Sequence, residues 1–149
     1  MRNRILLPLI FLFILNIHQV FAQVDTQDST GNFSLQLTGF EKAKGEVRIA
    51  MFNSEESYKA KKEPVYAVVL PVDSTSMTWE VERLPEGNYA IAVYHDENKN
   101  GKLDANLLGI PKERYGFSNN ARGRFGPASW KDAVFITLNG NTKHSIELK

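Results

Sequence analysis

Apolar and polar residues alternate along short segments of the chain, and this alternation is the strongest constraint on its fold. In the first segment Phe33, Leu35 and Leu37 fall on one side of an extended chain, and the residues between them are polar. A period of two over a few residues is typical of a β-strand with one buried face. The segment 65–70 is apolar on both faces, and turn-forming residues separate the segments. The pattern predicts an all-β, seven-stranded antiparallel β-sandwich, with strands over residues 33–37, 47–51, 65–70, 77–81, 89–93, 134–138 and 146–148.

Two local signals refine this expectation. Residues 54–62 lack strand periodicity and predict one or two helical turns before Pro64. The turn over residues 85–87 leads into the strand that begins at Tyr89. We expect Gly87 to need a backbone conformation that residues with side chains rarely adopt.

The N-terminal 22 residues have the features of an export signal. Arg2 and Arg4 precede an uncharged apolar run, and the small residue Ala22 favours cleavage directly after it. The run is shorter than the roughly 18 residues that a membrane span requires, and an uncleaved anchor is the alternative interpretation. We expect an exported protein, periplasmic or secreted, with no membrane span in the mature chain. Its predicted parts are a signal peptide over residues 1–22, a flexible leader over 23–32 and a single domain over 33–149.

Composition narrows the classes of function. The chain has no cysteine, which excludes disulfides, thiolate zinc sites and a cysteine nucleophile. The formal net charge is +1, and removal of the two signal-peptide arginines takes the mature chain to −1. So balanced a charge argues against nucleic-acid binding and against attachment to an anionic membrane by bulk charge.

Residues 96–132 form a long segment without strand periodicity, and they hold five of the ten glycines. Loops of this length in compact domains are usually functional or disordered. Because the segment also carries many apolar residues, we expect it to fold onto the sandwich as one long, ordered, glycine-rich excursion. The apolar residues are Leu103, Leu107, Leu108, Ile110, Tyr115, Phe117, Phe125 and Trp130.

The excursion opens with the spacing of a calcium-binding loop. Calcium takes about six to eight oxygen ligands, and side chains at every second residue of a tight turn can converge on one point. Gly101 permits the bend, and the backbone carbonyl of Lys102 supplies one ligand. The expected cofactor is Ca²⁺, and its expected ligands are Asp96, Asn98, Asn100, Lys102 and Asp104.

The match to a calcium loop is incomplete. The twelfth position, where a bidentate glutamate is expected, is Leu107, and no helices flank the segment. Glu97, Asn106 and Glu113 are candidates to complete the shell. The alternative is a metal-free turn in which Asp and Asn side chains bond their own backbone. Such a turn would hold two carboxylates close together without a counter-charge, since the lysines of the loop can reach solvent.

The sequence gives weaker evidence for other catalytic or ligand-binding residues. His95 is expected to be a structural histidine, and nothing in the spacing supports a triad of Ser118, His95 and Asp104. We interpret the basic residues of the excursion as a solvated face and its aromatic residues as a small core of its own. An anion site, and stacking on sugars or peptides, are the alternatives. The basic residues are Arg114, Arg122, Arg124 and Lys131, and the aromatic residues are Tyr115, Phe117, Phe125 and Trp130.

Two stretches of the excursion resemble a known bacterial family. The run from His95 to Ala121 and the stretch from Gly123 to Ala133 are similar to the signature of an exported family catalogued as domain of unknown function 2141. This resemblance implies no activity or substrate. The stretch from Arg83 to Tyr89 resembles the corner of prealbumin-like and Cna-B-type modules. It implies a prealbumin-like or immunoglobulin-like sandwich in which Tyr89 packs inward.

The modules that share this corner are mostly accessory, binding or structural units. The expected function is therefore a non-catalytic binding or structural module of the bacterial cell envelope with a calcium-type loop, whose partner is an envelope protein or a glycan. Two alternatives remain open. A metal-dependent hydrolase would need a base, for which His95 and Glu113 are the candidates. A small-ligand carrier would use residues 96–132 as a lid over a deep pocket.

Overall fold

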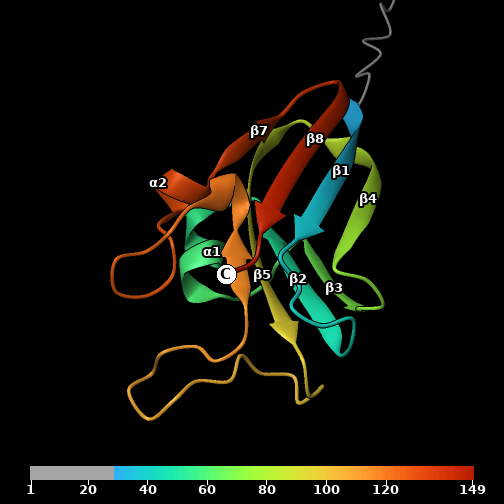
Figure 1. Cartoon of the computed structure of the whole chain (residues 1–149). Helices are drawn as coiled ribbons and strands as arrows, with labels where there is room; N and C mark the ends of the chain where they lie inside the picture. The colour runs from blue at the N-terminus through green and yellow to red at the C-terminus, as the bar shows by residue number, and fades with distance from the viewer. Residues whose placement is uncertain (1–28) are drawn as a thin grey trace, which may run out of the picture.

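The computed structural model describes residues 29–149, which form two β-sheets that face each other (Figure 1). The first sheet has the order β4-β1-β8. In it, β1 pairs antiparallel with β4 and parallel with β8. The strands of this sheet are β1 (Thr30–Thr38), β4 (Ser76–Pro85) and β8 (Gly140–Glu147).

The second sheet has the order β3-β2-β5-β6, and β7 pairs with the start of β5. Its strands are β2 (Glu46–Phe52), β3 (Tyr66–Pro71), β5 (Gly87–Asp96), β6 (Tyr115–Phe117) and β7 (Phe135–Thr137). The short helices are α1 (Glu55–Ala60), η1 (Ser118–Asn120) and α2 (Trp130–Ala133). No helix within residues 29–149 is long and apolar enough to cross a membrane.

The main core lies between the two sheets. Phe33, Leu35 and Leu37 of β1 are almost fully buried, as the period of two along the strand requires. Apolar side chains of β2, β4, β5 and β8 join them in one cluster. All members of this cluster within the described residues lie between Phe33 and Leu148.

A second apolar cluster includes residues of β2 and β5 that alternate with those of the main core. Here the two strands carry small residues, Ala50, Ala90 and Ala92, which let α1, α2 and the excursion pack closely against the sheet. Tyr58 of α1 fixes this contact, because its hydroxyl donates a hydrogen bond to the Ala128 carbonyl at 3.0 Å. Burial raises the pKa of Tyr58 to about 12, so the phenol stays protonated. The domain therefore has a third layer that the alternation did not indicate.

The predicted sandwich is confirmed, but the described chain has eight strands where the sequence predicts seven. The added strand is β6, whose three residues are too few to show a periodicity and are held by pairing with β5. The parallel pairing of β1 with β8 corrects the expectation of purely antiparallel sheets. Residues 30–32 also belong to β1, not to the predicted leader, because they pair with β4 and β8. The predicted signal peptide and residues 23–28 lie outside the described residues.

The predicted helical turn between β2 and β3 is confirmed as α1. Ser54 caps it by accepting a hydrogen bond from the backbone N–H of Ser57 at 3.2 Å. Lys61 ends it in the left-handed conformation, with its N–H bonded to carbonyls of the last turn. The helix therefore stops before Pro64 is reached.

The corner before β5 is built differently from the sequence prediction. Gly87 has no positive φ, and a Cβ added there would meet the Tyr89 ring at 3.5 Å, an ordinary contact distance. The prediction that Gly87 needs a conformation rare for other residues is therefore wrong. Tyr89 does pack inward, and its hydroxyl donates to the Pro85 carbonyl at 3.1 Å. The tyrosine side chain thus fixes this corner.

Candidate functional site

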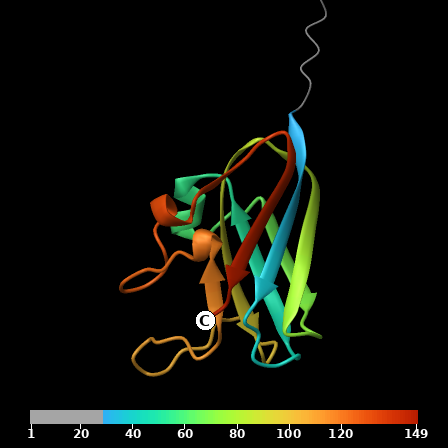
Figure 2. The same cartoon turned by 45° about the horizontal axis from the view of Figure 1, so that its top comes forward.

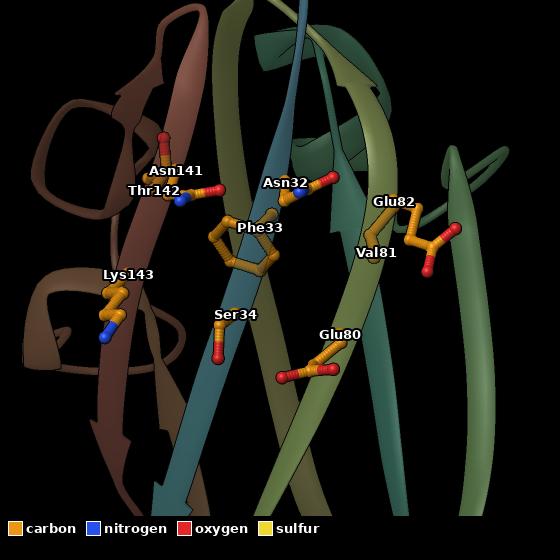
Figure 3. A pocket seen from close by; sticks show the side chains of 9 residues that line it. All are labelled: Asn32, Phe33, Ser34, Glu80, Val81, Glu82, Asn141, Thr142 and Lys143. Carbon is orange, nitrogen blue, oxygen red and sulfur yellow. The ribbon is translucent and has the colours of Figure 1, made fainter.

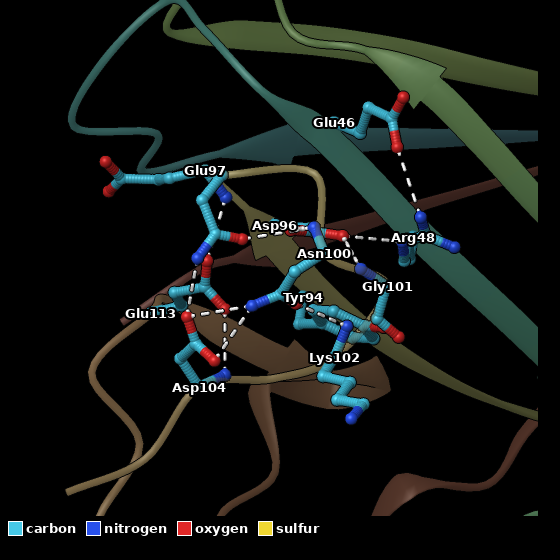
Figure 4. Close-up of polar contacts among 11 residues, drawn as sticks. Glu46, Arg48, Tyr94, Asp96, Glu97, Asn100, Gly101, Lys102, Asp104 and Glu113 are labelled. Atoms are coloured by element: carbon cyan, nitrogen blue, oxygen red, sulfur yellow. Dashed lines mark hydrogen bonds and ion pairs between the residues drawn. The ribbon is translucent and has the colours of Figure 1, made fainter.

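The candidate site is the turn over residues 96–104, together with the residues that it contacts (Figure 4). β5 ends at Asp96, which is paired with Glu46 of β2. The chain then turns at Gly101, whose φ of 79° is a left-handed conformation that glycine adopts without strain. The pairing of Asp96 with Glu46 and the bend at Gly101 place the turn beside the side chains at the start of β2.

Asp96 is the centre of the turn, and its side chain is fully buried. One carboxylate oxygen accepts the backbone N–H of Asn100 at 2.9 Å, and the other accepts that of Gly101 at 2.7 Å. The second oxygen also accepts Nε of Arg48, on β2, at 2.8 Å. The carboxylate therefore closes the turn and ties it to the sheet.

The pKa of Asp96 is set by two opposing effects. Burial would raise it, but the hydrogen bonds from Gly101, Arg48 and Asn100 outweigh burial and lower the pKa below its ordinary value of 3.8. The same bond to Asp96 raises the pKa of Arg48. The pair is therefore ionised at neutral pH.

Asn98 and Asn100, two of the other predicted ligands, meet at Asp104. Nδ2 of Asn98 donates to Asp104 at 2.7 Å, and Nδ2 of Asn100 donates to both of its oxygens at 3.0 and 3.1 Å. The amide oxygen of Asn98 accepts the N–H of Asn100 at 3.1 Å, and that of Asn100 accepts the N–H of Lys102 at 2.8 Å. The structure thus brings these residues together, with amide nitrogens facing the carboxylate.

Glu113, a candidate to complete the shell, reaches the turn from further along the excursion. It is buried, and its two oxygens accept the backbone N–H groups of Glu97 and Asp104, each at 2.9 Å. The Glu113 carboxylate therefore links the first part of the turn, at Glu97, to its last residue, Asp104. Within residues 29–149, no group of three or more His, Asp or Glu side chains is arranged to hold a metal ion.

Two acids of the turn, Asp96 and Glu97, face cations that the sequence analysis did not assign to them. Arg48 pairs with Asp96, while Lys42 and Lys44 lie 3.3 and 3.2 Å from the Glu97 carboxylate. The expectation of a turn without a counter-charge is therefore wrong for Asp96, while Asp104 forms no ion pair among the described residues. Sequence reasoning missed Arg48, because its only signal is a basic residue on the polar side of a strand. The register of β2 against β5 is needed to place it.

The residues with catalytic potential are engaged in structural contacts. Ser118 is fully buried, donates to the Ala133 carbonyl and accepts a backbone N–H of β5 at 2.9 Å. His95 is fully buried too, and its Nε2 lies 2.7 Å from the Lys44 carbonyl. Neither side chain bonds to the other or to Asp104, so the triad considered from the sequence is not formed.

The basic residues of the excursion divide into two groups. Arg114 pairs with Glu41, and Arg114 and Arg122 both donate to backbone carbonyls of residues 147–148. These two arginines anchor the excursion to the end of β8. The other basic residues are exposed and form no ion pair within the described part of the chain; they are Lys99, Lys102, Lys112, Arg124 and Lys131.

The apolar residues of the excursion also divide. Phe117 is buried, and Tyr115 and Trp130 pack against the second cluster, which confirms part of the predicted small core. For the rest the prediction is wrong, because the turn over residues 105–111 closes on its own hydrogen bonds and does not fold back onto the sandwich. The exposed apolar residues are Leu103, Leu107, Leu108, Ile110 and Phe125.

Two hollows lie along the β4-β1-β8 sheet. Figure 3 shows one of them, with the side chains of Ser34, Glu80 and Lys143 spread along neighbouring strands. No residue of the excursion lines either hollow. Neither is therefore a pocket for which residues 96–132 are the lid, as the carrier alternative requires.

Comparison with known proteins agrees with the resemblance noted from the sequence. The family model described as an uncharacterized protein conserved in bacteria (DUF2141) matches residues 35–145. No curated protein and no solved structure matches the chain. Nothing in the family description or in the contacts above points to catalysis.

Proposed function

The chain belongs to the uncharacterised bacterial family DUF2141, and from that premise we propose that it is an exported, non-catalytic module of the cell envelope. In this proposal the sandwich is a scaffold. The excursion over residues 96–132 is the element that binds a partner in the envelope.

The observation that carries the proposal is an excursion of fixed shape that presents exposed apolar side chains. Asp96 and Glu113 hold its beginning, and Arg114 and Arg122 hold its middle against the end of β8. Apolar side chains exposed on a rigid support are typical of interaction sites. The candidate bases of a hydrolase, His95 and Glu113, contact backbone groups, which favours binding over catalysis.

The proposal predicts a crosslink between the excursion and an envelope component. A photo-crosslinking amino acid replaces Leu108 in the full chain, which is expressed in a bacterial host. Because Leu108 is 84% exposed, illumination should join it to the partner. The intact mass of the recovered protein should show a chain that begins at Gln23, after cleavage at Ala22.

The matched control carries the same amino acid at Leu138, which is also exposed but lies outside the excursion. This position should give no adduct. No adduct at position 108, or equal adducts at both positions, would contradict binding through the excursion. Recovery of Met1 on membrane-bound material would contradict cleavage and release.

We also propose that Ca²⁺ binds the turn over residues 96–104. Support comes from the spacing of the ligand residues and from their convergence on Asp104. Rotating the amides of Asn98 and Asn100 would turn two oxygens toward that carboxylate. This rotation breaks hydrogen bonds, and Arg48 already neutralises Asp96. The affinity should therefore be modest, with a Kd of about 10⁻⁴–10⁻³ M, as in extracellular modules.

Calcium at about ten times its Kd should stabilise the domain by about 1.4 kcal/mol relative to a chelator control. For a domain of this size the melting temperature should rise by roughly 4–6 °C. Asp104→Asn should abolish the rise, while Asp73→Asn, at an exposed acid outside the turn, should retain it. Thermal denaturation measures the melting temperature, and calorimetry measures the heat of calcium binding. Equal melting with calcium and with chelator, together with no heat of binding, would establish the metal-free turn.

A further inference from the structure

The turn over residues 105–111 presents a fixed group of exposed aliphatic side chains. Leu107 is fully exposed, and Leu108 and Ile110 are 84% and 56% exposed. The side-chain oxygen of Asn106 accepts the backbone N–H groups of Leu108 and Ile110 at 2.9 and 3.0 Å. The backbone N–H of Asn106 donates to the Ile110 carbonyl at 2.8 Å. Turning these side chains inward would break the bonds, so their exposure is built into the turn.

A second exposed apolar side chain lies in the neighbouring loop over residues 121–128. Phe125 is 94% exposed, and the Arg124 guanidinium lies over its ring at 5.5 Å. In both views the two loops project from the same side of the sandwich (Figure 1, Figure 2). We refer to the exposed side chains of these loops as the apolar tips; they are Leu107, Leu108, Ile110 and Phe125.

Basic residues accompany the apolar tips along the chain. Residues 105–131 carry five basic side chains and one acid, Glu113. The whole excursion over residues 96–132 has seven basic and five acidic side chains, for a formal charge of +2. Both oxygens of Glu113 accept backbone N–H groups. Lys112, Arg124 and Lys131 are exposed and have no acidic partner among the described residues. The near-neutral charge of the whole chain therefore conceals a locally cationic segment.

We infer that the apolar tips insert into the surface of an anionic phospholipid bilayer. Apolar side chains flanked by Lys and Arg suit the boundary between anionic headgroups and acyl chains. A second copy of the chain is a poorer match, because charged side chains such as Glu80 and Lys143 line the hollow in Figure 3 and would face an inserted leucine. This inference rests on the proposed function, since it names the envelope component that the excursion binds.

A dye attached to the tips tests for insertion. The experiment uses the chain from Gln23 onward, which contains every described member of the main core, and vesicles of phosphatidylethanolamine with phosphatidylglycerol. Because the chain has no cysteine, Leu108→Cys can carry a single environment-sensitive dye, with Leu138→Cys as the matched control. The dye at position 108 should shift to shorter wavelength with these vesicles and not with phosphatidylcholine vesicles. The dye at position 138 should not shift with either.

Co-sedimentation with the same vesicles measures the contribution of the tips. Leu107→Ser, Leu108→Ser and Phe125→Ser together should lower the bound fraction about tenfold, because they remove the inserted apolar area. Ile136→Ser with Leu138→Ser, which removes two exposed apolar side chains elsewhere, should leave it unchanged. Higher salt should weaken binding by the wild-type chain. All five side chains are exposed, so both variants should keep the wild-type melting temperature.

Absence of the dye shift and of sedimentation, or equal binding to neutral vesicles, would overturn the lipid assignment. If crosslinking at position 108 then joins the chain to an envelope protein or a glycan, the proposed function stands and its lipid partner is wrong. If neither vesicles nor crosslinking give a signal, the proposed function fails as well.

Discussion

Replacing Tyr89 with alanine should lower the free energy of unfolding by about 3–5 kcal/mol, the cost of truncating a buried aromatic side chain. Tyr89 is 5% exposed and lies in the main core, where its ring packs near that of Phe135. Its hydroxyl also closes the corner before β5 through the Pro85 carbonyl. Removing the side chain therefore leaves a cavity and frees the turn at the same position. Chemical denaturation of the domain measures the loss.

Two further variants separate the contributions at this corner. Tyr89→Phe keeps the ring and removes the hydrogen bond, so it should cost about 1 kcal/mol. Gly87→Ala should change the stability by less than about 0.5 kcal/mol, the scale of ordinary surface substitutions, because the added Cβ meets the Tyr89 ring at an ordinary distance. A Gly87→Ala loss as large as that of Tyr89→Ala would show that the backbone at Gly87, not the tyrosine, holds the corner.

The sandwich was predictable because burial of one face imposes a period of two on the sequence. Strands were predicted at every long strand, and the β1 triplet Phe33, Leu35 and Leu37 is buried as expected. The last strand was predicted only over residues 146–148, whereas β8 begins at Gly140, because most of its side chains are not buried and show no apolar alternation. β6 was not located, because its three residues are fixed by main-chain bonds to β5 and not by a pattern of their own. The parallel pairing of β1 with β8 was equally hidden, since alternation carries no information on strand direction.

The third layer is indicated in the sequence by small residues on the outer face of two strands, which the alternation of apolar and polar residues does not reveal. Ala50, Ala90 and Ala92 occupy positions where a strand with one solvent face would carry polar residues. Alanines at alternate positions allow another element to approach the sheet closely. The exposure of Leu107 and Leu108 could not be predicted in this way, because it depends on hydrogen bonds that Asn106 makes within its own turn. An apolar residue in a loop predicts burial unless the local backbone prevents it.

The candidate site was predictable only in its local part. The spacing of Asp and Asn residues predicts that the side chains of residues 96–104 converge, and Asn98, Asn100 and Asp104 do meet. Arg48 comes from a strand that is distant in sequence, and its approach to Asp96 follows from the register of β2 on β5. A local motif therefore indicates which side chains of the turn lie close together. The tertiary structure determines which cation or hydrogen-bond donor from elsewhere in the chain contacts them.

Asp96→Asn should destabilise the domain by about 2–3 kcal/mol at neutral pH, the range for buried hydrogen bonds to a charged group. The substitution keeps the shape of the side chain but removes the charge that accepts bonds from Asn100, Gly101 and Arg48. It also turns an amide N–H₂ toward groups that are themselves donors. Asp73→Asn, at an exposed acid outside the turn, is the matched control and should have little effect. Urea denaturation at neutral pH compares the three proteins.

The pH dependence tests the same assignment independently. Since the pKa of Asp96 is lowered by folding, the unfolded chain binds this proton more readily than the folded chain, and stability rises with pH through that range. The contribution of Asp96 is complete above its ordinary pKa of 3.8 and is lost as the pH falls through the lower, folded-state value. The difference in stability between the wild type and Asp96→Asn should therefore be constant near neutrality and shrink in acid. A difference that stays constant down to the acid limit of folding would mean that Asp96 acts through its shape and not through its charge.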